Sequence, residues 1–236
     1  MASHLTKLEI NCDMGEGFGR WKMGPDEELM QYIDTANIAC GFHAGDPSLM
    51  LKTTWPVLGR RKMEIDPQDM YTMILYQVGA LKAMLDAEDV PLNHVKPHGE
   101  LFFYMMRDAE IRRAVLDACA HVHVPVYGCR NPEWKADCDK KGIFFQEEMY
   151  VDIDYDRQGR LLPVAKSQKA TAELVYDRVK SGGLHDTTKD NEGNELVLGF
   201  QGNPFSICIH SDMPTALDNA RAARKAVDAV NAERYV

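Results

Sequence analysis

Short apolar runs alternate along the chain with longer stretches whose apolar residues recur every three or four positions. The short runs are typical of buried strands, and the longer stretches are typical of helices that cover them. The predicted strands are 7–13, 35–41, the start of 92–100, 124–128, 143–152 and 205–212. The predicted helices are 26–34, 66–90, 108–122, a helix that closes at 137–142, 167–183 and 213–233.

The repeated order of strand and helix predicts an α/β fold in which crossover helices join parallel strands. About seven such units fit the length of the chain. This number favours a closed β/α barrel over an open doubly wound sheet, with residues 1–236 forming a single domain. No G-x-G-x-x-G follows the first strand, which argues against a dinucleotide-binding sheet.

The overall charge and the apolar runs exclude several classes of partner. The formal net charge of −9 disfavours nucleic-acid binding, because phosphates require a basic face. The sequence contains no run of about 18 apolar residues, so no membrane span is expected. The first residues also lack the apolar core of a signal peptide. We therefore expect a cytoplasmic protein that binds neither nucleic acid nor membrane.

The six cysteines include no C-x-x-C pair, which disfavours a zinc ribbon or a thioredoxin-like motif. Three disulfides would need an oxidising compartment, and no signal peptide is evident. We therefore expect buried free thiols.

Polar side chains follow the predicted strands, at the ends where parallel α/β folds build their sites. They are Asn11, Asp13 and Glu16, then Asn37, His43 and Asp46, then Lys96, His98 and Glu100, then Glu147 and Glu148, and finally His210 and Asp212. A single histidine at a strand end is more often structural than catalytic. A structural core would not gather so many charges, because a buried charge is costly unless it is paired. We therefore expect these side chains to meet in one polar centre.

Several of these motifs together resemble the LamB/YcsF family of lactam utilisation proteins, also known as the A subunit of the ATP-dependent 5-oxoprolinase. The matching segments are INCDMGEGFG (10–19), ANIACGFHAGDPSLM (36–50), GRRKM (59–63), YQVGAL (76–81), VKPHGELFF (95–103) and ICIHSD (207–212). The resemblance implies a seven-stranded β/α barrel of the glycoside hydrolase/deacetylase type. It also implies ATP-dependent opening of 5-oxoproline to L-glutamate, together with partner subunits B and C.

One segment departs from the family pattern. Members usually carry a helix and a strand ending in Gly-Ala-His-Pro where this chain has only SLMLKTTWPVL (48–58). A parallel strand needs a crossover of about a dozen residues, so this bridge cannot hold both elements. We expect one β/α unit to be short or absent. Such a gap exposes strand edges, which favours a homo-oligomer.

Ring opening requires a base for water, a donor for the developing oxyanion and an acid for the leaving nitrogen. The candidate base is Asp13, and the neighbouring carboxyl of Glu16 would raise the pKa of one of the pair. His43 and His98 are candidates for moving protons or polarising the carbonyl. Lys96 is a candidate for holding the substrate carboxylate or a phosphorylated intermediate. The resemblance adds Asp46 to the catalytic set. The candidate substrate-binding residues are Asn11, Asn37, Glu147, His210 and Asp212.

The sequence leaves the cofactors and two further functions open. Asp13, His43 and His98 could hold a divalent metal ion with a water in an open position. ATP would be handled through the complex, since the chain has no G-x-x-x-x-G-K-[ST] loop. The alternatives are a metal-dependent deacetylase-like hydrolase and a non-catalytic partner protein.

Overall fold

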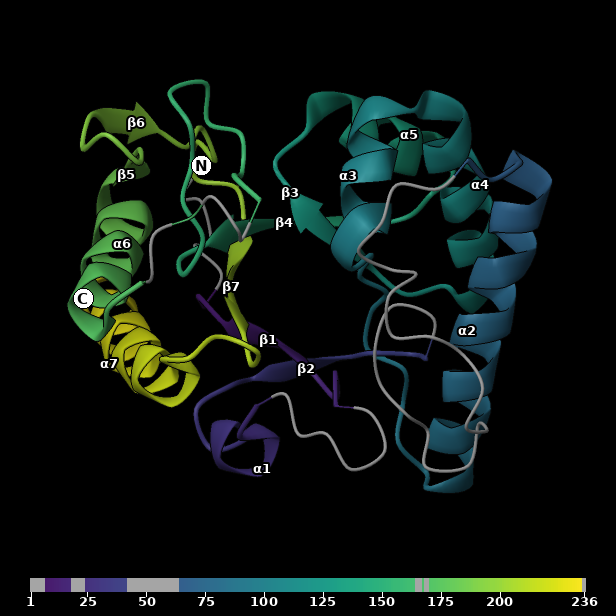
Figure 1. Cartoon of the computed structure of the whole chain (residues 1–236), viewed down its shortest axis with the longest axis horizontal. Helices are drawn as coiled ribbons and strands as arrows, with labels where there is room; N and C mark the ends of the chain where they lie inside the picture. Colours follow the sequence, from purple (N-terminus) through teal and green to yellow (C-terminus); the bar gives the residue numbers. More distant parts are fainter. Residues whose placement is uncertain (1–6, 18–23, 42–63, 164–166, 168–169, 235–236) are drawn as a thin grey trace. The chain divides into compact units, whose positions relative to one another are not determined.

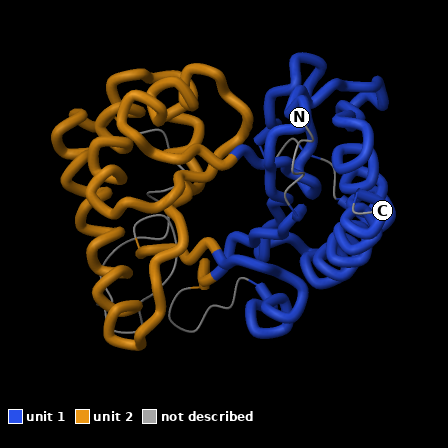
Figure 2. The backbone as a smooth tube through the Cα atoms, turned by 180° about the vertical axis from the view of Figure 1, so that it is seen from behind, with its two compact units in different colours: residues 1–14, 24–36, 147–236 blue, residues 15–23, 37–146 orange. Residues whose placement is uncertain are grey.

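The computed structural model describes residues 7–17, 24–41, 64–163, 167 and 170–234 (Figure 1). The chain divides into two compact units, coloured separately in Figure 2. Unit 1 comprises residues 1–14, 24–36 and 147–236, and unit 2 comprises residues 15–23 and 37–146. The single domain expected over residues 1–236 stays a prediction.

Parallel strands form the centre of unit 1. Strand β7 (Phe205–His210) lies between β1 (Ile10–Met14) and β4 (Phe145–Tyr150), and it is parallel to both. The strand order of the sheet is β2-β1-β7-β4-β3, where β2 is Thr35–Ile38 and β3 is Val126–Cys129. The α/β class with parallel strands is therefore confirmed.

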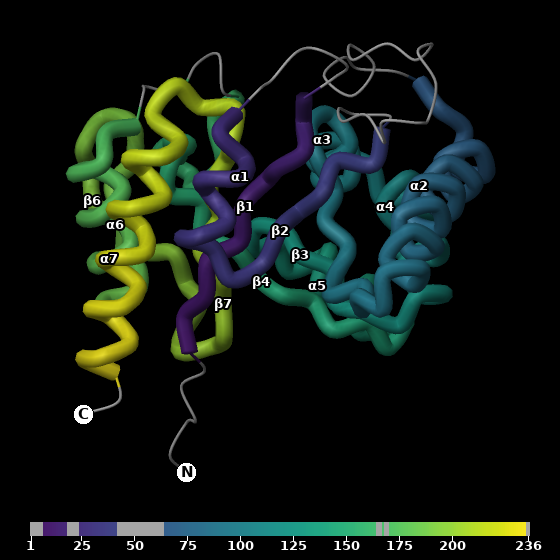
Figure 3. The backbone as a smooth tube through the Cα atoms, turned by 90° about the horizontal axis from the view of Figure 1, so that it is seen from below, coloured from purple at the N-terminus to yellow at the C-terminus, as the bar shows by residue number. Residues whose placement is uncertain are grey.

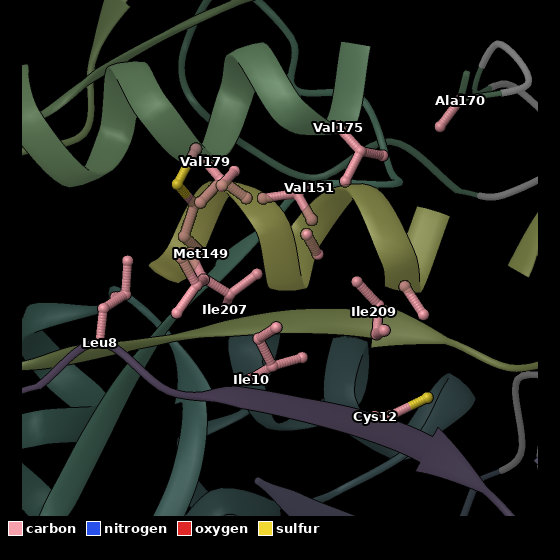
Figure 4. Close-up of a cluster of buried hydrophobic side chains, with 14 of the residues drawn as sticks. Leu8, Ile10, Cys12, Met149, Val151, Ala170, Val175, Val179, Ile207 and Ile209 are labelled. Atoms are coloured by element: carbon pink, nitrogen blue, oxygen red, sulfur yellow. The ribbon is translucent and has the colours of Figure 1, made fainter. Parts of the chain in front are cut away.

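The core of unit 1 lies between these strands and the helices α6 (Ala172–His185) and α7 (Ala216–Arg234). Successive side chains of a strand point to opposite sides. Ile10, Ile207 and Met149 are buried in the apolar cluster, and Figure 4 shows them with valines of α6. Along each strand, the residues that alternate with these apolar ones point to the other side, where the polar groups lie.

Helices α6 and α7 lie side by side in Figures 1 and 3, and they approach closely at Gly183. A Cβ atom on Gly183 would lie 2.7 Å from Val230 Cγ1 of α7. The sequence predicts that the helix ends at its two glycines. It instead runs through them to His185, and Asp186 ends it in the left-handed conformation. Close packing, rather than termination, explains these glycines.

Unit 2 is mainly helical. Its elements include α2 (Pro67–Ala87), α3 (Gly99–Arg107), α4 (Ala109–Cys119), the 3-10 helix η2 (Ala120–Val122) and α5 (Pro132–Lys140). The start of α2 is confirmed, since the Asp66 side chain accepts a hydrogen bond of 2.8 Å from Gln68 N. In 92–100 only Val95 forms a bridge, to Val126, and α3 follows directly.

Three elements differ from the prediction. Helix α1 (Asp26–Leu29) is a single turn, shorter than the predicted 26–34. Helix α3 and the antiparallel hairpin of β5 (Thr187–Lys189) and β6 (Glu195–Val197) were not predicted. The hairpin strands are too short to show a period, and Asp190 closes their turn by accepting from Asn194 N.

Two expectations about the whole chain can be compared with the structure. All six cysteines are free, as predicted. Among the described residues, no helix has both the length and the apolar character that a membrane crossing requires.

Candidate active site

The register of unit 1 aligns polar side chains in rows across β1, β7 and β4. Asp13 is paired with His210, Asn11 with Cys208, and Cys208 in turn with Tyr150. The last row, at the carboxyl ends of the strands, is completed by Asp152, two residues beyond β4. Parallel α/β folds place their chemistry at this end of the strands.

His210 is held between two carboxylates. Its Nδ1 atom lies 2.9 Å from Asp152 Oδ1, and its backbone N–H donates a bond of 2.7 Å to Asp152 Oδ2. Its Nε2 atom lies 3.6 Å from Asp13 Oδ2. The bidentate contact fixes the Asp152 carboxylate, and the carboxylate in turn fixes the orientation of the imidazole.

The electrostatics of this row favour a charged imidazole. Burial by itself lowers the pKa of His210. The charge of Asp152, followed by the charges of Cys208 and Asp13 and the hydrogen bond to Asp152, raises this pKa and outweighs the effect of burial. The net result is a pKa well above the ordinary value for histidine. This shift favours the protonated imidazole, which can donate a proton, and the carboxyl group of Asp13 lies beside it.

The neighbouring rows are polar and buried as well. Asn11 Nδ2 donates to Ser206 Oγ at 2.9 Å, and the Tyr150 hydroxyl donates to Glu148 Oε2 at 2.8 Å. The Tyr150 ring stacks on the His210 ring, with 6.0 Å between their centroids.

A second polar group lies in unit 2. His98 precedes α3, and its Nδ1 atom lies 3.9 Å from Glu16 Oε1, with both side chains at least nine-tenths buried. Lys96 is buried two residues before His98. Asn37 is hydrogen-bonded to His94 Nε2 at 2.5 Å. Asp13 belongs to unit 1 and these residues to unit 2, so their meeting in one centre stays a prediction.

The remaining candidates are placed as follows. His43, Asp46 and the 48–58 bridge lie outside the described residues, and the Asp13–His43–His98 metal set is therefore untested. Asp212 follows β7 and is partly buried. Glu147 is aligned with Phe205 of the apolar cluster, so alternation places it on the opposite side of β4 from Glu148.

Sequence reasoning gave no role to Asp152, Cys208 and Tyr150. The alternation in EEMYVD places Glu148, Tyr150 and Asp152 on one side of the strand, and that pattern was available. What the pattern lacks is the register, which brings Asp152 to His210 across 58 positions of the chain.

The fold and the polar row define an α/β protein with a candidate acid–base site at its strand ends. The model of the LamB/YcsF family matches residues 8–57 and 55–235. The chain is 38% identical over 249 residues to the lactam utilization protein lamB of Emericella nidulans, with 98% of each chain covered. It is 35% identical over 248 residues to the 5-oxoprolinase A subunit of Pyrococcus abyssi, with 94% of each covered.

A solved structure shows the same fold. The lactam utilization protein from Thermus thermophilus superposes with a TM-score of 0.82 at 31% identity, over 95% of this chain and 97% of that one. This chain belongs to the LamB/YcsF family, as the motifs indicated.

Proposed function

We propose that this chain hydrolyses a cyclic amide, and that the reaction is the opening of 5-oxoproline to L-glutamate. The observation that carries the proposal is the row Asp13–His210–Asp152, at the strand ends of a protein whose relatives are named for lactam utilization and for 5-oxoprolinase. These groups match the needs of amide hydrolysis, which requires both a base and an acid.

The roles follow from the charges. Asp13, as a carboxylate, accepts a proton from the attacking water. His210, protonated between two carboxylates, donates a proton to the leaving ring nitrogen. Asp152 does not touch the substrate; it positions His210 through Nδ1. This division of labour resembles that of other sites in which a carboxylate orients a histidine.

The other candidate residues keep their predicted roles in this proposal. Glu16, His43, Asp46 and His98 belong to the catalytic set, and Lys96 holds the substrate carboxylate. Asn11, Asn37 and Asp212 bind the substrate. Glu147 is the exception, because it lies on the opposite side of β4 from the polar rows. Asn11 is the member nearest in register to the acid–base row, one row before Asp13.

The proposal also covers partners and location. The word "subunit" in the names of relatives supports a complex, in which partner subunits B and C join this chain and ATP is consumed. The reaction would take place in the cytoplasm.

The proposed architecture is a seven-stranded barrel of the glycoside hydrolase/deacetylase type that lacks most of one β/α unit. The family model matches in two pieces that meet at residues 55–57, which supports a break in the family pattern there. An incomplete barrel would pair its open strand edges in a homo-oligomer.

The test is ATP-dependent glutamate release from 5-oxoproline, measured for this chain with and without purified subunits B and C. We expect release with the full set. Asp13→Asn should lower turnover by about 10²–10⁴-fold, because a positioned general base contributes about that much.

The matched control is Asp228→Asn on α7, where the carboxylate is two-thirds exposed and its ion pair is with Arg224, one helical turn away. It should leave turnover unchanged. Wild-type turnover in Asp13→Asn would remove Asp13 from the mechanism. No glutamate release in any combination would favour the non-catalytic role.

A metal-dependent hydrolase is the second candidate. One observation favours it: ligand atoms of Asp13, Cys208 and His210 lie within 4.8 Å of one another.

A further inference from the structure

Cys208 occupies an unusual place for a buried structural thiol. Cys12 of β1, also fully buried, is part of the apolar cluster with Ile207 and Ile209. Cys208 lies between those two isoleucines in the sequence and therefore points to the polar side of β7. There its Sγ atom lies 4.0 Å from His210 Nε2. A polar surrounding calls for an explanation other than core packing.

The three donors have nearly the spacing of a metal site. A tetrahedral zinc ion binds nitrogen and oxygen at about 2.0 Å and sulfur at about 2.3 Å, which places the ligand atoms about 3.3–3.6 Å apart. His210 Nε2 lies 3.6 Å from Asp13 Oδ2 and 4.0 Å from Cys208 Sγ. These two distances exceed the tetrahedral spacing by a few tenths of an ångström, and all three ligand atoms lie within 4.8 Å of one another.

Asp152 supplies the outer support that such a site needs. A histidine that binds a metal commonly donates its other ring N–H to a carboxylate, which fixes the tautomer and the ring orientation. Asp152 Oδ1 lies 2.9 Å from His210 Nδ1, and the backbone N–H of His210 donates a hydrogen bond to Oδ2 of the same carboxylate. The Nε2 atom is thereby directed to Asp13 and Cys208.

We propose that Asp13, Cys208 and His210 bind one divalent cation of the zinc type, with Asp152 as the positioning residue. A thiolate, an imidazole and a carboxylate together favour zinc over magnesium or calcium, which prefer oxygen ligands. All four residues belong to unit 1. The site differs from the Asp13–His43–His98 set expected from the sequence.

This inference deepens the proposed function and rests on it only for the use of the ion. When bound, the ion would polarise the lactam carbonyl. Asp13 would then be a ligand rather than the base, and His210, bound through Nε2, would no longer be the proton donor. The two assignments exclude each other, and a direct measurement of metal binding separates them.

The test is a titration of the metal-stripped, full-length chain with Co²⁺, followed by absorption spectroscopy. We expect one equivalent to bind, with a thiolate-to-cobalt charge-transfer band, and Zn²⁺ to displace it. X-ray absorption of the zinc-loaded wild type should show one sulfur at about 2.3 Å. This measurement needs no variant, so it decides the question even if a variant fails to fold.

The variants identify the ligands. Cys208→Ser should abolish the charge-transfer band, and Asp152→Asn should weaken binding about 10–100-fold. Cys129→Ser, at a partly exposed thiol in unit 2, is the matched control and should bind as the wild type does. Circular dichroism confirms that each variant is folded.

Three results would overturn the metal site: no stoichiometric binding to the wild type, cobalt binding without the thiolate band, or wild-type binding by a folded Cys208→Ser. The titration contains no 5-oxoproline, so its outcome is separate from the glutamate assay. A bound metal without glutamate release contradicts only the proposed function. Glutamate release without a bound metal contradicts only the site.

Discussion

Arg112 and Asp137 show how a single buried charge pair shapes unit 2. Arg112 on α4 is almost fully buried, and its Nε atom donates to Asp137 Oδ2 on α5 at 2.9 Å. A second donor, Nη1, reaches the carbonyl of Met105 at 3.0 Å. Burial by itself raises the pKa of Asp137, but hydrogen bonds from Lys140 and Arg112 outweigh it and lower the pKa below its ordinary value.

Asp137→Asn should therefore destabilise the protein at neutral pH by about 1.5–3 kcal/mol, the range for hydrogen bonds to charged groups. A lowered pKa stabilises the fold above the unfolded pKa of about 3.9, and this contribution is lost as pH falls through the folded value. The difference in the free energy of unfolding between wild type and variant, measured by urea unfolding, should therefore shrink from pH 7 toward pH 3.

The control on the same helix is Asp139→Asn, where an exposed carboxylate pairs with exposed Lys135. It should change the free energy of unfolding by less than about 1 kcal/mol at any pH, because exposed ion pairs contribute little. A difference for Asp137→Asn that stays constant with pH would show that its charge is not the source of stability.

At the scale of elements, the packing of α6 on α7 depends on the absence of a side chain at Gly183. Val230 Cγ1 and Cγ2 would lie 2.7 and 2.9 Å from an added Cβ, and Val230 is fully buried. A β-branched valine is stiff about χ1 and cannot rotate away easily. The two helices would have to separate.

Gly183→Ala should destabilise the protein by about 1–3 kcal/mol, the usual cost of overpacking, in spite of the better helix propensity of alanine. The matched control is Gly79→Ala inside α2, where no described atom lies within 4 Å of the added Cβ. Gly79→Ala should raise the free energy of unfolding by about 0.4–1 kcal/mol. Thermal unfolding of both variants measures the contrast, and equal effects would contradict close packing as the reason for Gly183.

At the scale of the whole molecule, the cysteines are distributed over both units and none is bridged. Burial of Cys119, and after it the charge of Cys138, raises the pKa of Cys119 to about 12. Burial of Cys138, followed by the charges of Asp139 and Asp137, raises its pKa to about 12 as well, against the smaller lowering by Lys135 and Arg112. The thiolate, which is the reactive form, is therefore scarce at pH 8.

In denaturant without reductant, the metal-stripped chain should react with six equivalents of a thiol reagent, one for each free cysteine. In the native state, Cys119 and Cys138 should resist alkylation at pH 8, while partly exposed Cys129 reacts first. Peptide mass mapping locates the modified thiols. Fewer than six thiols in denaturant would reveal a disulfide and contradict the free cysteines.

The sequence by itself determined the α/β class, the family and the strand ends that carry polar groups. It also determined the start of α2, because residue 66 begins the predicted helix 66–90 and the Asp66 side chain caps the observed one. These features depend on neighbours a few positions apart, so periodicity and capping chemistry show them. The sequence likewise predicted that Asp13 and His210 lie at strand ends.

Only the tertiary structure decided which of those groups meet. The contact of His210 with Asp152 and the approach of Cys208 depend on the register of β7 with β4 and with β1, strands that are far apart in the chain. The same holds for Gly182 and Gly183, which look like a helix end in the sequence. Gly182 packs against Met149 of β4, and Gly183 packs against Val230 of α7. Periodicity gives the side on which a residue lies, whereas register and helix spacing come from hydrogen bonds and packing between distant segments.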